Sequence, residues 1–470
     1  MRILSGFHGV AMATTMFSVL LGASALSAEE FSYAEAAKPY AGTTITVLDE
    51  VTPLQETLAT IVPEFSKETG ITVQYELLSH LDVINKGQAD MLSRGGAYDA
   101  VMLHGAQMGP MLDAEAIRPI DDFVADPKLS NAGLDTDDLI QRPFRSLAFF
   151  KDKQYGFINW NYNMVYWARA DLLGNEIEKA AFKEKYGYDL GPAQTLKQLR
   201  DISEFFTRKR GEKLMGEPLA EDFYGVVLEG IKGANSLWLY IGNILRNYGG
   251  DIIDADGKPS FNTPEVVDSL AYWAELWKFS PPGTAEYSII DVPTVMSNGI
   301  AAQTMAFSDF VLGVDKPGAS PLHGSFVYGA PPVKEDVDPS RYSADGEPSM
   351  IVITQGSKNA EATFLFLQWL TEKKQQSALL KAGNGGVPIR ESSWAELKSM
   401  DGVNSSLMDA MKVSLGRVES KPLMPNYYQV IDALAEIVQQ VGLGTVSPQE
   451  GAAQGQAALE RLCGDNCLLK

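Results

Sequence analysis

The sequence has few of the residues that build metal sites. It contains four histidines and two cysteines in 470 residues. His8 lies close to the N-terminus, and His80, His104 and His323 do not follow any metal-ligand spacing along the chain. Lysine-containing phosphate loops, dinucleotide fingerprints and the Gly-x-Ser-x-Gly nucleophile motif are also missing from a suitable context. We therefore expect no bound metal and no other cofactor.

Basic residues are scarce relative to acidic ones. The chain has 39 Lys and Arg against 60 Asp and Glu, for a formal net charge of −21. Residues 1–28 contain one Arg and no acid, so their removal gives −21 − 1 = −22. A negative field of this size repels phosphate backbones and anionic lipid head groups. The balance excludes nucleic acid as an expected partner but identifies no ligand.

Long apolar runs are absent beyond the N-terminus. Arg2 precedes an apolar, small-residue run from Val10 to Ala25, and no acid appears before Glu29. This pattern predicts a secretory signal peptide over residues 1–28, with cleavage after Ala25 or Ala28. No second run approaches the ~18 residues that a membrane span needs. The mature chain is expected to be exported to the periplasm as a soluble protein.

The two cysteines lie close together near the C-terminus. Cys463 and Cys467 are separated by Gly-Asp-Asn. In an oxidising compartment this spacing allows a small disulfide loop, and the alternative is a pair of metal ligands. The absence of a nearby histidine favours the disulfide.

Apolar strands alternate with helical patterns through the first hundred residues. Strands are expected at 43–48, 71–77 and 98–103, and the intervening segments have helical periodicity. This order is typical of an α/β fold with a parallel sheet. Ligands of such sheets lie beyond the carboxyl ends of strands. Further strands are expected at 223–228, 301–307 and 346–354.

Residues 155–167 combine aromatic and amide side chains where a plain strand would carry only hydrophobes. The stretch includes Trp160, Asn161, Tyr162 and Asn163 and has no charged residue. Aromatic faces and amide groups together suit a neutral polyhydroxylated ligand. The alternative is an aromatic core strand with Asn at its bends.

Several landmarks recur in an order that is characteristic of one family. They are Phe65-Ser-Lys-Glu-Thr-Gly-Ile-Thr-Val, Tyr98-Asp-Ala-Val-Met, Tyr155-Gly-Phe-Ile, Tyr166-Trp-Ala-Arg-Ala-Asp-Leu-Leu, Asn247-Tyr-Gly-Gly-Asp, Ala301-Ala-Gln-Thr-Met-Ala-Phe, Tyr328-Gly-Ala-Pro-Pro and Gly386-Val-Pro-Ile-Arg. Over residues 41–395 the chain resembles family 1 extracellular solute-binding proteins, the carbohydrate-binding receptors of ATP-binding-cassette (ABC) importers.

The resemblance implies a two-lobed periplasmic binding protein fold, in which each lobe has a mostly parallel sheet flanked by helices. It implies an N-terminal lobe of residues 41–160 plus 302–346 and a C-terminal lobe of residues 161–301 plus 347–470. Strands would cross between the lobes near Trp160, near Ala301 and near Met350. The expected protein is a monomeric receptor, not an enzyme, that binds a carbohydrate or polyol between its lobes and delivers it to a membrane permease.

The same resemblance suggests the residues that would contact the ligand. They lie at strand ends, in the crossing segment, in one helix and in a glycine-rich loop, and they are Asp49, Glu50, His104, Gln107, Trp160, Asn161, Asn163, Trp238, Ser308, Asp309, Gly385, Gly386 and Arg390. Structural alternatives stay open for many of them. These alternatives are a helix-start acid pair for the first two, core packing for Trp238, and an ion pair between lobes or at the surface for Arg390.

Two other functions are compatible with the sequence. An exported glycosidase would need two spaced carboxylates, but no interpretable catalytic motif is present. The other alternative is the same receptor fold with a polyamine or another small solute as its ligand. For a cation, Asp49, Glu50, Asp309 and Trp160 would have to form an acidic aromatic box.

Overall fold

The computed structural model describes residues 31–232, 236–315, 318, 320–338, 346, 348–382, 387–400, 404–418 and 421–469, without the side chains of Pro53, 236–240, 312 and 313. The expected signal peptide, residues 1–28, lies outside this part of the chain. Within it, no helix has the length and apolar character required to cross a membrane.

The described chain contains two main sheets and two short hairpins. The first sheet has the strand order β2-β1-β3-β12-β6 and the second has the order β10-β7-β11. The strands are β1 (Thr44–Glu50), β2 (Thr72–Leu78), β3 (Ala100–His104), β4 (Phe149–Phe150), β5 (Lys153–Gln154), β6 (Gly156–Trp160), β7 (Met164–Arg169), β8 (Lys213–Leu214), β9 (Glu217–Pro218), β10 (Gln303–Phe307), β11 (Phe326–Gly329) and β12 (Ser349–Ile353).

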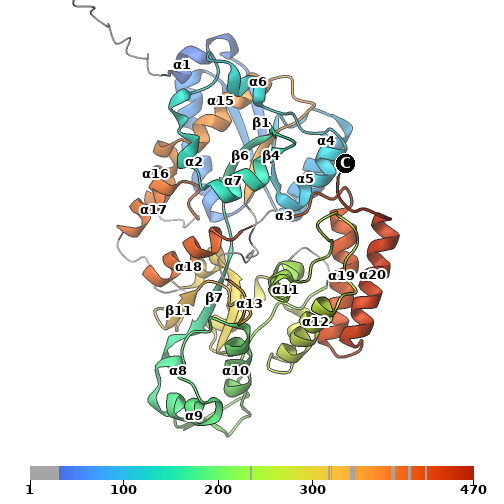
Figure 1. Cartoon of the computed structure of the whole chain (residues 1–470). Helices are drawn as coiled ribbons and strands as arrows, with labels where there is room; N and C mark the ends of the chain where they lie inside the picture. The colour runs from blue at the N-terminus through green and yellow to red at the C-terminus, as the bar shows by residue number, and fades with distance from the viewer. Residues whose placement is uncertain are drawn as a thin grey trace, which may run out of the picture. The chain divides into compact units, whose positions relative to one another are not determined.

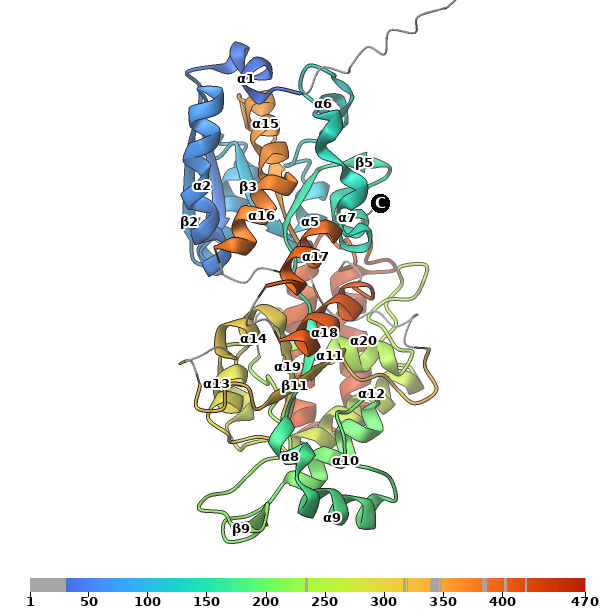
Figure 2. The same ribbon diagram turned by 90° about the vertical axis from the view of Figure 1, so that its left-hand side faces the viewer.

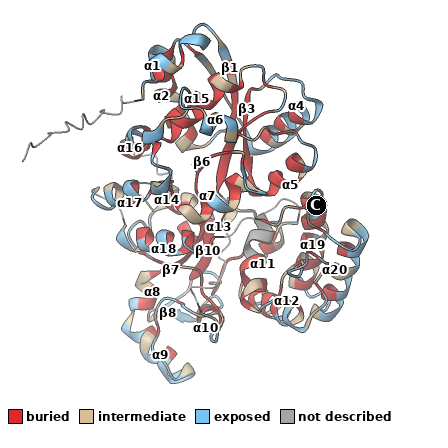
Figure 3. Cartoon of the chain, turned by 45° about the horizontal axis from the view of Figure 1, so that its top comes forward, coloured by how far each residue is buried: buried red, intermediate tan, exposed pale blue. Residues whose placement is uncertain are grey.

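Four strands of the first sheet run in the same direction. β1 pairs in parallel with β2 and β3, whereas β12 runs antiparallel to both β3 and β6. Ser349, the first residue of β12, pairs with both His104 and Trp160. The carboxyl ends of β1, β2, β3 and β6 therefore meet at one edge of the sheet. Figure 3 shows β1, β3 and β6 largely buried among helices whose outer surfaces are exposed, whereas β2 is only partly buried.

Helices from distant parts of the sequence flank the first sheet. α15 packs on β6 and β12, while α16 packs on α2, as Figure 2 shows. Thr52 caps the N-terminus of α2, and Gly70 ends it with a φ of 73°, a conformation that glycine adopts without strain. The helices are α1 (Tyr33–Ala36), α2 (Pro53–Thr69), α3 (His80–Asp82), α4 (Gln88–Ser93), α5 (Gly105–Asp113), α6 (Asp121–Ala125), α7 (Gln141–Ala148), α15 (Ala360–Thr371), α16 (Lys373–Lys381) and α17 (Glu391–Lys398).

The second sheet is also flanked by helices. α18 packs on β7 and β11, and α12 packs against α19 and α20, which lie side by side in Figure 1. Thr263 caps α12, and Pro264 is its first residue. The helices are α8 (Ala170–Gly174), α9 (Glu176–Tyr186), α10 (Leu196–Phe206), α11 (Ser236–Asn247), α12 (Pro264–Trp277), α13 (Asp291–Ser297), α14 (Ser308–Val314), α18 (Ser405–Leu415), α19 (Tyr427–Gly442) and α20 (Pro448–Cys463).

β7 is apolar because both of its faces are covered. Met164, Tyr166 and Ala168 belong to one buried cluster, and Val165 and Trp167 belong to another. Alternate residues of a strand point to opposite faces, so a strand buried on both sides loses the usual apolar–polar alternation. The aromatic run after residue 163 is therefore core.

The chain passes from the first sheet to the second between β6 and β7, where the sequence predicted a crossing. The two later strands were predicted in the wrong sheets. β10 pairs with β7 in the second sheet, and β12 pairs with β3 and β6 in the first. A five-residue apolar strand buried on both faces has the same local pattern in either sheet, and only its distant partners distinguish the two.

The strand expected at 223–228 also differs. Phe223 and Tyr224 form only isolated bridges, to Arg208 and Ala301. The segment then runs beside β10, where the Val227 amide donates to the Gln303 carbonyl and the Thr304 hydroxyl donates to the Val227 carbonyl. The apolar residues pack as expected, but no regular ladder forms.

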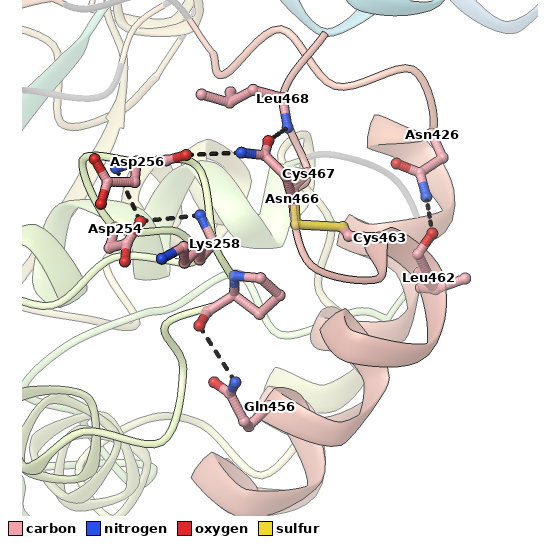
Figure 4. Close-up of a disulfide and its surroundings, with 11 residues drawn as sticks. Asp254, Asp256, Lys258, Asn426, Gln456, Leu462, Cys463, Asn466, Cys467 and Leu468 are labelled. Carbon is pink, nitrogen blue, oxygen red and sulfur yellow. Dashed lines mark hydrogen bonds between the residues drawn. A yellow bond between two sulfur atoms is a disulfide. The ribbon is translucent and has the colours of Figure 1, made fainter. Parts of the chain in front are cut away.

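A disulfide joins Cys463, the last residue of α20, to Cys467 (Figure 4). The loop it closes contacts the turn after α11: Asn466 Nδ2 donates to the Asp256 carbonyl at 2.7 Å, and the Cys467 amide donates to the Gly257 carbonyl at 2.8 Å. These hydrogen bonds hold the disulfide loop against residues about two hundred positions earlier in the chain.

Candidate functional site

Three side chains from adjacent strand ends converge at the edge of the first sheet. Glu50 ends β1, which lies between β2 and β3, His80 begins α3 shortly after β2, and His104 ends β3. His80 Nδ1 lies 2.9 Å and His104 Nε2 lies 3.0 Å from the same oxygen, Oε2 of Glu50. Burial raises the pKa of Glu50, but the hydrogen bonds from His104 and His80 outweigh it and lower that pKa to about 2. Glu50 is therefore an ionised carboxylate.

A row of aromatic rings continues from these histidines toward the second sheet. The His104 ring centroid lies 5.2 Å from that of His80, 6.2 Å from that of Trp160 and 5.8 Å from that of Tyr162. Tyr162 in turn lies 5.0 Å from Trp160 and 5.4 Å from Phe307, the last residue of β10. The row therefore links the strand ends of the two sheets. We call these five residues the aromatic row.

Trp160 has an unusual position in the aromatic row. Its side chain is buried, yet its Nε1 has no hydrogen-bond partner among the described residues. A buried donor without a partner costs about 1–3 kcal/mol. A water molecule or a ligand oxygen would remove that cost. Trp160 therefore combines a ring surface with a free polar atom, as the sequence analysis expected of a ligand contact.

Asp49 lies next to Glu50 but points into the fold. It is fully buried and accepts hydrogen bonds from Tyr75 Oη at 2.5 Å, Asn159 Nδ2 at 3.2 Å and the Glu50 amide at 2.7 Å. Burial raises its pKa to about 7, although the Tyr75 hydrogen bond acts in the opposite direction. The side chains of Asp49 and Glu50 therefore point to opposite faces of the sheet, because alternate residues of a strand face opposite ways. Neither acid begins a helix, since α2 starts at Pro53.

Gln107 has a clear structural contact. Its Oε1 accepts a hydrogen bond from the His104 amide at 2.9 Å and completes a capping box at the start of α5. Its Nε2 is buried and has no partner among the described residues. The side chain therefore fixes the backbone that carries His104.

Asn161, Asn163 and Ser308 fasten the crossing between the sheets. Asn161 Nδ2 donates to the Pro388 carbonyl at 3.1 Å, and Asn163 Nδ2 donates to the Met411 carbonyl at 2.9 Å. The Ser308 hydroxyl donates to Asn163 Oδ1 at 3.0 Å. All three side chains are fully buried. Their contacts join the crossing to segments far along the chain, and only Asn161 keeps a buried polar atom, Oδ1, without a partner in the described structure.

Asp309 lies in the first turn of α14, two residues after Phe307 of the aromatic row. Its Oδ1 is buried with no partner among the described residues. Burial raises its pKa to about 6, and the negative charge of Glu50 contributes in the same direction. Asp309 is the acid of this region whose side chain is least satisfied.

Replacing Asp309 with Asn is expected to stabilise the protein near pH 7.5. A pKa of about 6 in the fold, against an ordinary 3.8, means that ionising Asp309 destabilises the folded state. The stabilisation that protonated Asp309 contributes to the folded state is fully present below about pH 4 and is lost as the pH rises through 6. The upper limit of the effect is about 3 kcal/mol, and partial exposure reduces it to roughly 1–2 kcal/mol. Denaturant unfolding at pH 7.5 and pH 4 measures this gain, which should vanish at pH 4.

The control is Asp189→Asn. Asp189 is exposed, and its ion pair with Lys183 lowers its pKa. This substitution should not stabilise the protein at pH 7.5. A gain for Asp309→Asn that is equal at both pH values would contradict the burial of its charge.

The other predicted contacts fall outside this cluster or outside the described structure. Gly385 and Gly386 are not among the described residues, and Trp238 lies in α11 with only its backbone described. Arg390 is completely buried, with its guanidinium bound to the carbonyls of Leu134, Asp135 and Thr371 and to Asp138. All the donor nitrogens of the Arg390 side chain are used by these acceptors, so the structure gives no support to its prediction as a ligand contact. Its ion pair with Asp138 is buried and does not lie at the surface.

Sequence reasoning missed His80, Tyr162 and Phe307 as parts of the site. His80 was not selected because the histidines show no metal-ligand spacing along the sequence. The sequence did offer one indication of its role. His80 follows the second predicted parallel strand, just as Glu50 follows the first. Tyr162 was within the aromatic stretch but was not selected, and Phe307 was taken as the last residue of a strand.

Comparisons with known proteins agree with this architecture. Residues 50–377 match the sequence family described as bacterial extracellular solute-binding protein. An erythritol/L-threitol-binding protein of Mycolicibacterium smegmatis is 22% identical over 75% of this chain and 71% of that protein. A probable amino-acid ABC transporter periplasmic-binding protein of Sinorhizobium fredii is 25% identical over 76% of this chain and 74% of that protein.

A solved structure shows the same fold. An ABC transporter solute-binding protein from Agrobacterium radiobacter, determined in complex with ribitol, superposes with a TM-score of 0.73. It is 24% identical and the match covers 90% of this chain and 99% of that chain. The two sheets with their helices are therefore the two lobes of a periplasmic binding protein fold. The chain belongs to the family of bacterial extracellular solute-binding proteins.

Proposed function

We propose that this solute-binding protein captures a neutral polyol or sugar between its two lobes and delivers it to the permease of an ABC importer. In this proposal it is exported to the periplasm through a cleaved signal peptide, acts as a monomer and has no enzymatic activity. The observation that carries the proposal is the aromatic row joining the strand ends of both sheets, with the unpaired polar atoms of Trp160 and Asp309 beside it.

The chemistry of this region suits a polyhydroxylated solute. Ring faces contact C–H groups, while the indole N–H and the Asp309 carboxylate offer a donor and an acceptor to hydroxyl groups. Erythritol, threitol and ribitol, which two of the related proteins bind, are ligands of this kind. A solute that contacts both lobes stabilises the closed arrangement through its differential contacts.

A second candidate is a cationic or zwitterionic solute. The acids near the aromatic row and the amino-acid transport name of the Sinorhizobium relative favour it. The hydrogen bonding disfavours it, because His80 and His104 engage Glu50 while Tyr75 and Asn159 engage Asp49. Of the three acids expected in a cation box, only Asp309 keeps a buried oxygen unpaired.

A thermal-shift screen distinguishes the two candidates. The panel is erythritol, L-threitol, ribitol, D-mannitol and maltose, with putrescine, spermidine and the common amino acids as the competing classes. A solute present at 100 times its dissociation constant should stabilise the protein by about 2.7 kcal/mol. We expect a polyol or sugar to raise the unfolding midpoint. A rise with a polyamine or an amino acid only would overturn the proposal.

A further inference from the structure

Glu50, His80 and His104 form a cluster of metal-ligand type in addition to their place in the aromatic row. The nearest ligand atoms of the three side chains all lie within 4.8 Å of one another. Both imidazole nitrogens approach one carboxylate oxygen, at 2.9 and 3.0 Å. Two imidazoles and one carboxylate are a common ligand set for zinc and its neighbours among the transition metals.

The fold explains why these residues meet. β2, β1 and β3 are adjacent and parallel, so their carboxyl ends lie at one edge of the sheet. Each strand end contributes one ligand, with the acid from the central strand and one histidine from each side. The ligands are 54 residues apart at most in the chain, from Glu50 to His104. Residues that converge at the edge of a sheet need no regular spacing along the chain. The lack of metal-ligand spacing in the sequence therefore does not exclude this site.

We propose that Glu50 Oε2, His80 Nδ1 and His104 Nε2 bind a divalent transition-metal ion of the zinc type, with a fourth coordination position left for water or a solute oxygen. Ligand atoms around tetrahedral zinc lie about 3.4 Å apart, given bonds of about 2.0–2.1 Å. The two acid–imidazole separations, 2.9 and 3.0 Å, are within about 0.5 Å of that value, and all three ligand atoms lie within 4.8 Å of one another, so side-chain adjustments bring them to it.

Burial and access both suit such a site. The Glu50 and His104 side chains are 14% and 7% exposed, so an ion between them is shielded from water. The His80 side chain is 50% exposed, so it leaves a path for the ion and can adjust its position. The site thus has two well-held ligands and one mobile ligand at its outer side.

Tyr162 supplies a supporting contact on the far side of His104. Its hydroxyl lies 3.1 Å from His104 Nδ1. When Nε2 binds a metal, Nδ1 carries the proton and donates to the tyrosine oxygen, which fixes the ring orientation and the tautomer. The capping contact of Gln107 with the His104 amide holds the same residue from its backbone.

Metal content measured on the exported chain without a polyhistidine tag tests this site. The protein is stripped with EDTA, dialysed against Zn²⁺, and analysed for zinc per chain, with the visible absorption of Co²⁺ as an independent report of tetrahedral coordination. We expect about one equivalent of Zn²⁺. His80→Ala should weaken binding about 100-fold, and Tyr162→Phe about 10-fold.

The matched control is His323→Ala. His323 pairs with Asp315 in another part of the fold, with Nδ1 3.1 Å from the carboxylate, and it should not alter the zinc content. His80 is half exposed, so its replacement leaves the core intact. Less than a tenth of an equivalent at 100 µM free Zn²⁺ would overturn the proposal, as would equal losses from His80→Ala and His323→Ala. The metal measurement needs no solute, so its result is separate from that of the thermal-shift screen.

Discussion

Replacing Trp160 with Ala is expected to abolish the solute-induced rise in unfolding temperature. Trp160 ends β6 at the lobe crossing and contacts the rings of both His104 and Tyr162. Central aromatic residues of binding sites contribute about 2–4 kcal/mol to affinity. Losing the indole should weaken binding about 100-fold. Isothermal titration with the best solute from the screen measures the change directly.

Trp394→Ala is the matched control for this substitution. Trp394 is 5% exposed against 6% for Trp160, and its Nε1 is also buried without a partner in the described structure. Both variants should lose stability by a similar amount, about 3–5 kcal/mol, because each removes a buried indole. Only Trp160→Ala should lose the solute response. A retained response in that variant, or an equal loss in both, would remove Trp160 from the site.

Local features of the fold were predictable because short-range physics determines them. Gly70 ends α2 in a left-handed conformation, and Thr263 with Pro264 begins α12, as their types and positions in the sequence indicate. Strands β1, β2 and β3 follow from their apolar runs and the helices between them. Their parallel pairing follows from the strand–helix–strand order.

Long-range partners were not predictable in the same way. β10 and β12 are both short buried strands, and nothing within five apolar residues specifies which sheet they join. The ligand set of Glu50, His80 and His104 depends on the order β2-β1-β3, which no spacing along the chain reveals. Arg390 followed a glycine-rich segment that resembled a ligand loop, but three of its four partners, among them Asp138, lie more than 250 residues earlier.

Replacing Arg390 with Met is expected to cost about 3–5 kcal/mol of folding free energy, with no direct effect on the solute site. The guanidinium is completely buried and donates to three backbone carbonyls and to Asp138 Oδ2, the last at 3.2 Å. Methionine occupies a similar volume but offers no donor. The carbonyls would then stay buried without partners, and Asp138 would lose its counter-charge.

Arg210→Met and Arg390→Lys distinguish the loss of this buried network from the loss of a charge alone. Arg210 pairs with Glu221 at the surface, with its side chain 73% exposed, so its removal should cost no more than about 1 kcal/mol. Lysine at position 390 keeps the charge but cannot reach all four acceptors. The folding free energy lost in Arg390→Lys should therefore lie between the losses in the two Arg→Met variants. Urea unfolding measures all three variants. Arg390→Met must also keep the solute affinity of the parent when assayed well below its midpoint, because Arg390 makes its contacts with Leu134, Asp135, Asp138 and Thr371 and none with the aromatic row.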